Sequence, residues 1–441
     1  MLYLHQQFLT IALCAICCFG ASKRVSVEFS PSSGVTFRAG ETRNVTAILS
    51  SFDITKFQVR FACANADICE VLSDSTKIDL TLDASYNLTL RGLFLGHSHL
   101  QIIAQNSTVH FNTKPFQIAI LRTDEGAQLS RIFTACIATF IGINTFFMGT
   151  QLEVEVIKEC VKQPIGPAIG FCCQYLFMPL IGFCWATFLL EGRSLLQFSY
   201  FAVACSPGGG NSNLWTILLE GNLDLSVTMT FFSNLAAIGM MPLWLSTLGR
   251  LFFSGAVKIP FLYMLQTLVA LIIPNCFGLS MAYFKPHLKK KFKQILKIFT
   301  LTFAIILIPF AIYSNLFIFR LFRWYTVVSG FLLPWTGYAL SYLIAYMLKR
   351  THKDCRTIAI ETGIQNSKLA AFLCQWSLEE PDSDLSLVMP LCVILFTTVP
   401  LWLFLVLLKC KNRADRRKTA NQKENDEIGA NNGSNHLVPV Q

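Results

Sequence analysis

The sequence carries little charge and lacks the motifs of enzymes and metalloproteins. Of its 441 residues, only 14% are charged and 53% are hydrophobic, and the mean hydropathy is +0.50. Soluble domains of this size are more polar, so the composition excludes an ordinary soluble protein and predicts a polytopic membrane protein. There is no nucleophile–base motif, and the cysteines and histidines do not have the spacing of a zinc site. We therefore expect neither an enzyme nor a bound cofactor.

Nine apolar segments are each long enough to cross a hydrocarbon core of roughly 30 Å. Basic residues gather in the loops 285–294, 349–356 and 409–418, whereas the loop 379–384 is acidic. The positive-inside rule then predicts an extracellular N-terminus and a cytoplasmic C-terminus. The same placement accounts for the formal net charge of +10 without nucleic acid as a partner. The segments are residues 129–149, 164–190, 194–219, 225–248, 259–284, 295–319, 325–348, 357–377 and 385–408.

The two ends of the chain have compositions unlike the rest. Leu9–Phe19 is an apolar run too short to span a membrane, and small residues follow it. Residues 1–22 are therefore interpreted as a signal peptide cleaved after Gly20 to Ser22, although a retained anchor is an open alternative. The polar residues 409–441 predict a disordered cytoplasmic tail, in which the sequon at Asn432 should stay unused.

Residues 23–128 have the pattern of a separate extracellular domain. Apolar and polar residues alternate in four short stretches with Gly, Ser and Asn between them, which predicts a small antiparallel β-sandwich. Cys63 and Cys69 are the two cysteines between the signal and the first span, and in an oxidising lumen we expect them to form a disulfide. Three sequons in the domain predict glycosylation in the secretory lumen, at Asn44, Asn87 and Asn106.

Polar residues interrupt two of the apolar segments. One interruption is Ser206–Asn213, and the other is Glu361–Asn366. Hydrocarbon cannot satisfy freed backbone groups or a charge, so broken helices persist only inside protein or along a cavity. Each broken segment is the second span of a group of three, spans 2–4 and spans 7–9. The two lie five positions apart in the order of spans, so the two groups enter the membrane from opposite sides. This predicts an inverted repeat whose broken helices cross at a binding site.

The fold class follows from these observations. We expect an all-α polytopic membrane protein of nine transmembrane helices, with an inverted repeat and two broken crossing helices, preceded by a small β-sandwich-like extracellular domain. The predicted domains are residues 1–22, 23–128, the transporter domain 129–408, and 409–441.

Glu361 is the most informative single residue, because a carboxylate within a span costs several kcal/mol unless it is paired. One interpretation is an interfacial glutamate paired with Arg356. The other is a cation ligand, which the polar neighbours Thr362, Gln365 and Asn366 favour.

Other spans carry neutral oxygen donors. Ser212 and Asn213 follow the glycine-rich break, and Ser226 and Thr230 lie on one helical face, where they either face a site or bond to their own helix carbonyls. Gln174 is an isolated amide that either faces the same site or joins two helices. Neutral oxygens around one carboxylate suit a hard monovalent cation, and sodium is the natural candidate.

Long ordered strings resemble the sodium/bile-acid cotransporter family over nearly all of residues 129–408. They read FCCQYLFMPLIGF (Phe171–Phe183), SPGGGNSNLWTILLEGNLDLSVTMT (Ser206–Thr230), GMMPLWL (Gly239–Leu245) and CRTIAIETGIQN (Cys355–Asn366). The glycosylated extracellular domain is similar to the P3-like branch, since bile-acid carriers have only a short N-terminal tail.

This resemblance implies two sodium sites and alternating access between a core of spans 2–4 and 7–9 and a panel of spans 1, 5 and 6. The first sodium would be held by Ser212, Asn213, Ser226, Thr230 and Glu361. The second would be held by Gln174, Glu361, Gln365 and the carbonyls of Thr362 and Ile364. Residues expected along the substrate cavity are Gly209, Gly210, Asn366 and Lys368.

The sequence departs from the family pattern at several positions. Ser206 replaces a cysteine, Gly210 and Asn211 replace a Thr-Ala pair, and Glu220 and Asn222 stand where carriers usually have aspartate. Lys368 occupies a position that is usually neutral. Its side chain either snorkels toward the outer face, or attracts an anionic substrate or replaces one sodium.

We expect sodium-coupled symport of an organic anion that is bile-acid-like or steroid-sulfate-like, in the plasma membrane. The partners would be Na+, the amphipathic anion, the lipid bilayer and a partner of the extracellular domain. The alternative is a non-transporting receptor or adhesion protein that acts through its extracellular domain.

Overall fold

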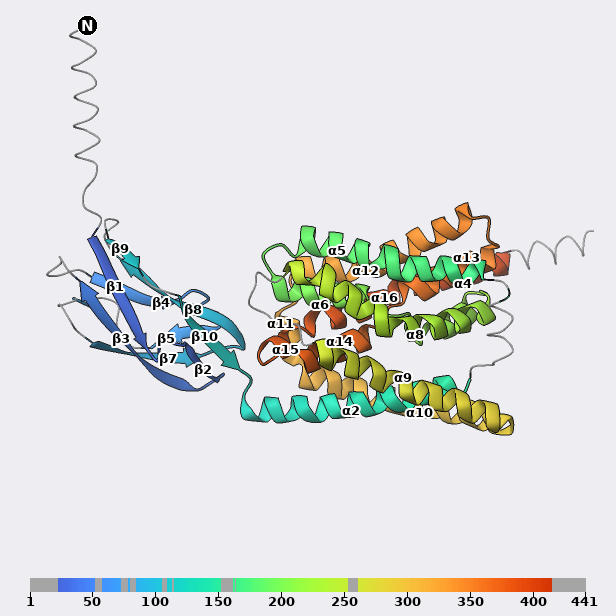
Figure 1. Ribbon diagram of the computed structural model, residues 1–441, viewed down its shortest axis with the longest axis horizontal. Helices are drawn as coiled ribbons and strands as arrows, with labels where there is room; N and C mark the ends of the chain where they lie inside the picture. Colours follow the sequence, from blue (N-terminus) through green and yellow to red (C-terminus); the bar gives the residue numbers. More distant parts are fainter. Residues whose placement is uncertain are drawn as a thin grey trace, which may run out of the picture. The chain divides into compact units, whose positions relative to one another are not determined.

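The computed structural model describes residues 23–51, 58–72, 78–79, 85–104, 109–112, 115–151, 162, 164–252 and 261–414. Contacts divide the chain into two compact units at Ile132 and Phe133, with Glu380–Asp382 grouped with the first unit. The first unit is rich in strands and the second is helical (Figure 1). The predicted signal peptide, the sequon at Asn106 and most of the predicted tail lie outside the described residues.

The N-terminal unit consists of two five-stranded sheets, in the orders β5-β7-β3-β1-β9 and β2-β10-β8-β4-β6. Most neighbours are antiparallel as the alternating pattern predicts, but β1 pairs with β9, and β2 with β10, in parallel. The strand before β9 in the chain is β8, which belongs to the other sheet. Because no hairpin joins β9 to its neighbour β1, these two strands can pair in parallel. The strands are β1 (Lys23–Ser30), β2 (Val35–Arg38), β3 (Thr42–Ser51), β4 (Gln58–Cys63), β5 (Cys69–Val71), β6 (Ile78–Asp79), β7 (Ser85–Gly92), β8 (Gly96–Ala104), β9 (Val109–Asn112) and β10 (Phe116–Leu121).

Alternate residues of these strands form the core of the unit. Val45 and Ala47 on β3, and Leu90 on β7, are fully buried, whereas the residues between them face outward. Cys63 at the end of β4 and Cys69 at the start of β5 are joined by a disulfide. The pattern of period two therefore places one face of each sheet inside the unit.

The second unit is built from helices, and every apolar segment named above is mainly helical in the described residues, with breaks in segments 194–219 and 357–377. The first of these helices begins at Asp124, before the predicted start at residue 129, because Asp124 and Glu125 favour a helix N-terminus. The helical elements are α2 (Asp124–Gly149), α4 (Ile165–Cys172), η1 (Cys173–Phe177), α5 (Met178–Leu189), α6 (Ser194–Ala204), α7 (Ser212–Leu218), α8 (Leu223–Thr247), η2 (Gly249–Phe252), α9 (Phe261–Phe284), η3 (Pro286–Leu288), α10 (Lys289–Ser314), α11 (Leu316–Arg320), α12 (Trp324–Met347), α13 (His352–Gly363), α14 (Ser367–Ser377), α15 (Asp382–Leu385) and α16 (Val388–Thr397).

Five described helical stretches are long and apolar enough to cross a membrane. The two interrupted segments are not among them, because each forms two shorter helices, α6 with α7 and α13 with α14. Nor are α9 and α10, so nine spans stay a prediction. The five are Asp124–Phe147, Ile165–Leu189, Leu223–Phe252, Trp324–Met347 and Asp382–Ala414.

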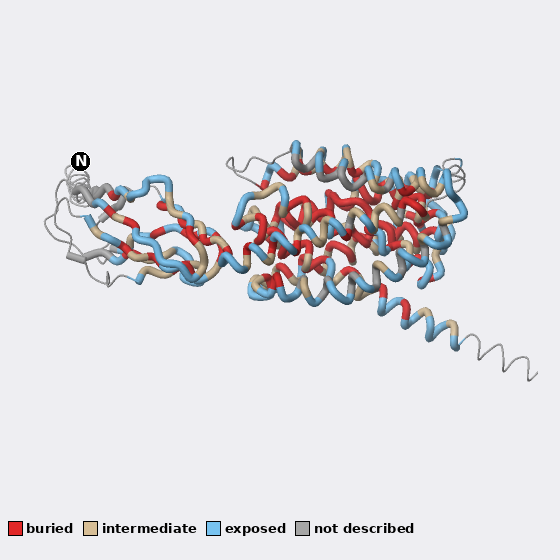
Figure 2. Tube along the Cα trace, turned by 90° about the horizontal axis from the view of Figure 1, so that it is seen from below, coloured by how far each residue is buried: buried red, intermediate tan, exposed pale blue. Residues whose placement is uncertain are grey.

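Large apolar side chains cover the outside of the helical unit. Phe188 is 76% exposed and Ile305 is 66% exposed, whereas Tyr200 and Met241 are fully buried. Buried residues follow the inner helices in Figure 2, and exposed residues follow the outer ones. Water does not tolerate so much exposed apolar surface, but a bilayer does. The composition, the length of the helices and the exposed apolar surface together identify this chain as a multi-pass membrane protein.

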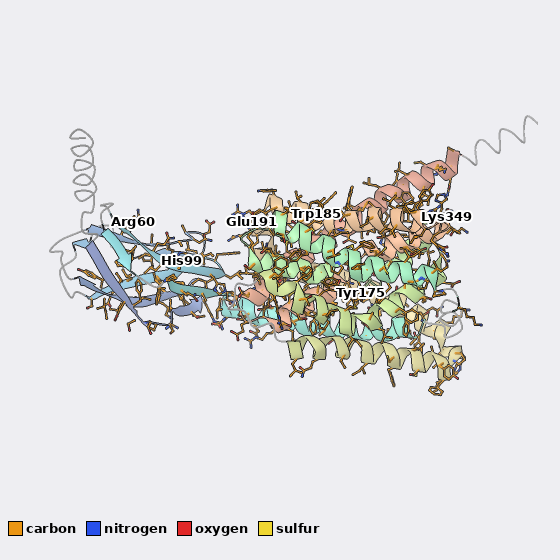
Figure 3. The ribbon with its side chains drawn as sticks, turned by 45° about the horizontal axis from the view of Figure 1, so that its top comes forward. Arg60, His99, Tyr175, Trp185, Glu191 and Lys349 are labelled. Atoms are coloured by element: carbon orange, nitrogen blue, oxygen red, sulfur yellow. A yellow bond between two sulfur atoms is a disulfide. The ribbon has the colours of Figure 1, made fainter. Side chains whose placement is uncertain are left out.

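The helical unit has two distinguishable ends. Figure 3 shows Glu191, which follows α5, and Lys349, which follows α12, at opposite ends of it. Three helices also form an aromatic-packed group: α2 contacts α9 and α10 through Phe146–Phe277 and Phe140–Phe299, with ring centroids 5.9 and 5.7 Å apart. The same three helices lie together in Figure 1.

Candidate functional site

The two helix breaks meet and pair with each other. Gly208 and Gln365 form an isolated antiparallel bridge, Gly209 N donates to Ile364 O at 2.7 Å, and Asn366 N donates to Pro207 O at 2.9 Å. Pro207 has no N–H to continue α6, and its carbonyl is satisfied by the other break. The backbone groups freed by each break thus bond to the other break, which is how irregular backbone survives at membrane depth.

The two breaks approach so closely that little room remains for a side chain at either glycine. A Cβ atom on Gly208 would lie 2.7 Å from Glu361 Oε1, and one on Gly209 would lie 3.0 Å from Gln365 O. The crossing therefore brings the backbone of the first break against the carboxylate of α13 with no room for a side chain.

Glu361 is 1% exposed, in the last turn of α13, and hydroxyl groups from α8 surround its carboxylate. Thr230 Oγ1 donates to Oε1 at 2.5 Å and Ser226 Oγ lies 3.0 Å from Oε2, whereas the buried Ser212 Oγ has no hydrogen-bond partner. Arg356 instead donates to Leu219 O at 3.0 Å. The arrangement therefore disfavours an interfacial glutamate paired with Arg356.

Two hydroxyl groups of this first oxygen cluster, those of Ser226 and Thr230, each face more acceptors than they have hydrogens. Ser226 Oγ lies 2.8 Å from Asn213 Oδ1 and 3.0 Å from Glu361 Oε2, but a hydroxyl has a single hydrogen for these two acceptors. Thr230 Oγ1 likewise lies within hydrogen-bond distance of both Ser226 O and Glu361 Oε1, and its single hydrogen serves these two acceptors. A cation would satisfy the oxygens that the hydroxyl hydrogens leave unbonded.

The second predicted set of ligands also lies together, linked by its own hydrogen bonds. Gln174 is 3% exposed, in the π-helical turn η1, and its Nε2 donates to Ser206 O at 2.7 Å and to Gln365 Oε1 at 2.8 Å. Gln365 Nε2 donates to Thr362 O at 2.6 Å, and Ile364 O accepts from Gly209 N. A cation here would compete with amide hydrogens, whereas the first cluster needs no such rearrangement.

Three members of the network were not predicted as ligands. Thr216 Oγ1 donates to Ser226 Oγ at 3.2 Å, Ser233 Oγ accepts from Gly208 N at 3.3 Å, and Ser206 Oγ lies 3.3 Å from Gln365 Oε1. The spacing could have indicated the first two. Thr216 is four residues after Ser212, and Ser233 is three after Thr230, so each shares a helical face with a predicted ligand. Ser206 had no comparable periodic signal.

A cavity lies beside the crossing. All four predicted cavity residues line it, as do Phe140 and Asn144 of α2. Lys368 Nζ lies 5.4 Å from the centre of the Phe140 ring, within the range of a cation–π contact. Lys368 is exposed and is one of the residues that line this cavity. The residues from the two breaks along this cavity are Pro207, Gly209, Gly210, Asn211, Ile364, Gln365, Asn366, Ser367, Lys368 and Leu369.

Two other departures from the family pattern have structural partners. Asn222 caps α8 by accepting from Leu225 N at 3.2 Å, and its Nδ2 donates to Asp354 Oδ1 at 2.9 Å. Glu220 is exposed, and its Oε1 accepts from Asn412 Nδ2 at 3.0 Å. Neither side chain is among the residues that line the cavity.

Two of the predicted glycosylation sequons pair with each other on the outer face of the sheet that contains β3 and β7. Thr89 Oγ1 donates to Asn44 Oδ1, and Thr46 Oγ1 donates to Asn87 Oδ1, each at 3.0 Å. Both asparagines are exposed, and these bonds use Oδ1 rather than Nδ2, the atom that carries an N-linked glycan.

We expect Asn44→Gln and Asn87→Gln each to remove one glycan, because both side chains are open to solvent. The measurement is gel mobility before and after treatment with an N-glycosidase, and the double variant should shift by both glycans. Asn432→Gln is the matched control and should not change mobility. A shift for Asn432→Gln, or none for the two domain variants, would contradict the predicted topology.

Comparison with known proteins yields one family. The model of the Sodium Bile acid symporter family matches residues 138–320. The mouse ileal sodium/bile acid cotransporter is 32% identical over 314 residues, which cover 68% of this chain and 87% of that protein.

Two other kinds of relative match as well. A bovine sodium-dependent organic anion transporter is 34% identical over 259 residues, covering 57% of this chain and 66% of its own. The mouse P3 protein is 31% identical over 259 residues, covering 58% and 54%. The carriers and the P3 protein thus resemble this chain at similar identity.

Proposed function

We propose that this chain, which belongs to the sodium bile acid symporter family, couples the inward movement of sodium to that of an organic anion. The observation that carries this proposal is the fully buried Glu361 carboxylate, which neutral oxygens surround where two broken helices cross. A buried carboxylate that pairs with hydroxyl groups alone is costly, and a bound cation offsets that cost.

Sodium would occupy two positions that share Glu361. In the first, the ligands are Ser212, Asn213, Ser226, Thr230 and Glu361, and the deficit of hydrogens in this cluster supports it. In the second, Gln174, Gln365 and the carbonyls of Thr362 and Ile364 join Glu361. The side-chain amides of this set already form hydrogen bonds, so a second ion must displace Gln365 Nε2 from Thr362 O. We therefore expect the first position to bind sodium more tightly.

Alternating access would move a core, formed by spans 2–4 and 7–9, against a panel formed by spans 1, 5 and 6. The aromatic contacts of α2 with α9 and α10 support a panel of these three helices. Nine spans with the N-terminus outside would place Glu191 at the outer end and Lys349 at the inner end; Figure 3 shows these two residues at opposite ends of the helical unit. The plasma membrane is the expected location.

The proposed substrate is an amphipathic anion that is bile-acid-like or steroid-sulfate-like. Two relatives are described as bile acid or organic anion transporters, and the cavity beside the crossing is lined by apolar side chains, by neutral amides and hydroxyls, and by one lysine. Two sodium ions with one monovalent anion would carry one net positive charge inward. At −100 mV this adds about 2.3 kcal/mol to the drive from the sodium gradient.

The direct test is uptake of radiolabelled taurocholate and of dehydroepiandrosterone sulfate by cells expressing the chain. We expect uptake in sodium medium, and uptake at the level of untransfected cells when choline replaces sodium. Equal uptake in the two media would refute coupling to sodium.

The alternative function, a receptor or adhesion protein, is favoured by a single observation: the N-terminal unit has its own buried core and disulfide. A receptor would need residues 23–128 and would tolerate substitution of the sodium ligands. The symporter proposal expects the reverse for uptake, so the two are separated by comparing a deletion of 23–128 with Glu361 variants at equal surface expression.

A further inference from the structure

A positively charged side chain in the cavity has no carboxylate partner among the described residues. Lys368 lies in the first turn of α14, and the residues that line the cavity include no aspartate or glutamate in the part of the chain that the structure describes. Its ammonium group lies over the ring of Phe140, which is a weak substitute for a counter-ion. Charged residues inside a membrane normally pair with an opposite charge or face a ligand path, so the missing partner points to a ligand.

A second group at the same place also lacks a partner. The Ser367 hydroxyl is 2% exposed, lines the cavity, and has no hydrogen-bond partner. Burying a hydroxyl without a partner costs free energy of about 1–3 kcal/mol. The residue stands at the first position of α14, whose N-terminal end carries the positive side of the helix dipole. The N-terminal end of α14, the Ser367 hydroxyl and the Lys368 ammonium group therefore all favour a negatively charged oxygen at this place.

We propose that Ser367, Lys368 and the N-terminal end of α14 form an oxyanion subsite that binds the sulfate, sulfonate or carboxylate group of the substrate. The apolar body of the substrate would then lie against Phe140, Trp215 and Ile394 of the same cavity. The inference rests on the proposed function for its substrate class, but binding can be tested without transport. It also goes beyond the resemblance, since the family usually has a neutral residue at position 368.

The subsite sits next to the sodium cluster without sharing its ligands. Asn366 caps α14 and also donates its backbone N–H to Pro207 O, so the start of α14 is fixed to the crossing itself. An anion bound there would lie near the cations held by Glu361, and each would lower the cost of burying the other. Such mutual stabilisation is the reciprocal coupling that symport requires.

The test uses the full-length protein purified in detergent, with thermal unfolding as the readout. The probes are taurocholate, dehydroepiandrosterone sulfate and its neutral parent, dehydroepiandrosterone. In the Lys368→Gln variant we expect the affinity for the two anions, read from the concentration that stabilises the protein, to fall about 10- to 100-fold. The stabilisation by the neutral steroid and by sodium should not change. Lys368→Arg should keep the anion response. Lys353→Gln, an exposed lysine of α13, is the matched control and should behave as wild type.

The outcomes separate this inference from the proposed function. Anion-dependent stabilisation that Lys368→Gln abolishes, in a protein that shows no sodium-dependent uptake, would support the subsite and refute symport. Wild-type protein that no anion stabilises, or equal anion response in Lys368→Gln and wild type, would overturn the subsite. A rise in the sodium Hill coefficient of Lys368→Gln without a change in the anion KM would also overturn it, because Lys368 would then replace a sodium ion.

Discussion

Glu361→Ala is expected to abolish sodium-dependent uptake. The carboxylate accepts from Thr230 and lies against Ser226, and it supplies the negative charge of the first oxygen cluster. Removing one partner of a buried charged group costs about 2–5 kcal/mol, which lowers apparent sodium affinity by about 30-fold or more. Uptake in sodium medium, normalised to surface expression, is the measurement.

Glu361→Gln is the sharper variant, because the amide keeps the shape and one acceptor oxygen of the side chain but not its charge. We expect it to reach the surface and fold well, since loss of an unpaired buried charge removes a desolvation cost. Sodium should stabilise the wild-type protein against heat by mass action and should fail to stabilise Glu361→Gln. The exposed Glu191→Gln is the control. A sodium response in Glu361→Gln equal to wild type would refute the assigned role.

Local patterns predicted the elements well. Apolar length indicated each helical segment, alternation indicated β1, β7 and β8, and the polar interruptions indicated both helix breaks. These features depend on residues near one another in the chain, so the local pattern of apolar and polar residues is enough to predict them.

Long-range features were less accessible. The parallel pairing of β1 with β9 depends on a chain crossing between sheets, and nothing in either strand encodes it. The π-helical turn at Gln174 depends on contacts with Ser206 and Gln365, which are distant in sequence. Thr216 and Ser233 share faces with predicted ligands, but hydroxyls often bond only to their own helix, so spacing did not distinguish them. The site was predicted as a set of residues, whereas its hydrogen-bond pattern required the fold.

Gly208→Ala is expected to disrupt the same site from the opposite break. The added Cβ would lie 2.7 Å from Glu361 Oε1 and 3.2 Å from Glu361 O, so the carboxylate must shift away from the hydroxyl groups of α8. Overpacking of this kind costs about 1–3 kcal/mol, or about 5- to 150-fold in apparent sodium affinity. Gly239→Ala in α8 is the matched control, because a Cβ there meets nothing within 4 Å, and it should leave sodium affinity unchanged.

A double variant decides whether the clash is the cause. Aspartate is one methylene shorter than glutamate, so Gly208→Ala combined with Glu361→Asp should lose less sodium affinity than the two single losses added together. The measurement is the sodium half-saturation of uptake for wild type, both single variants and the double variant. Strict additivity of the four values would mean that residue 208 acts on the site without contacting Glu361. If the double variant loses at least tenfold less sodium affinity than the single variants combined, a difference of about 1.4 kcal/mol, then residue 208 and the Glu361 carboxylate interact directly.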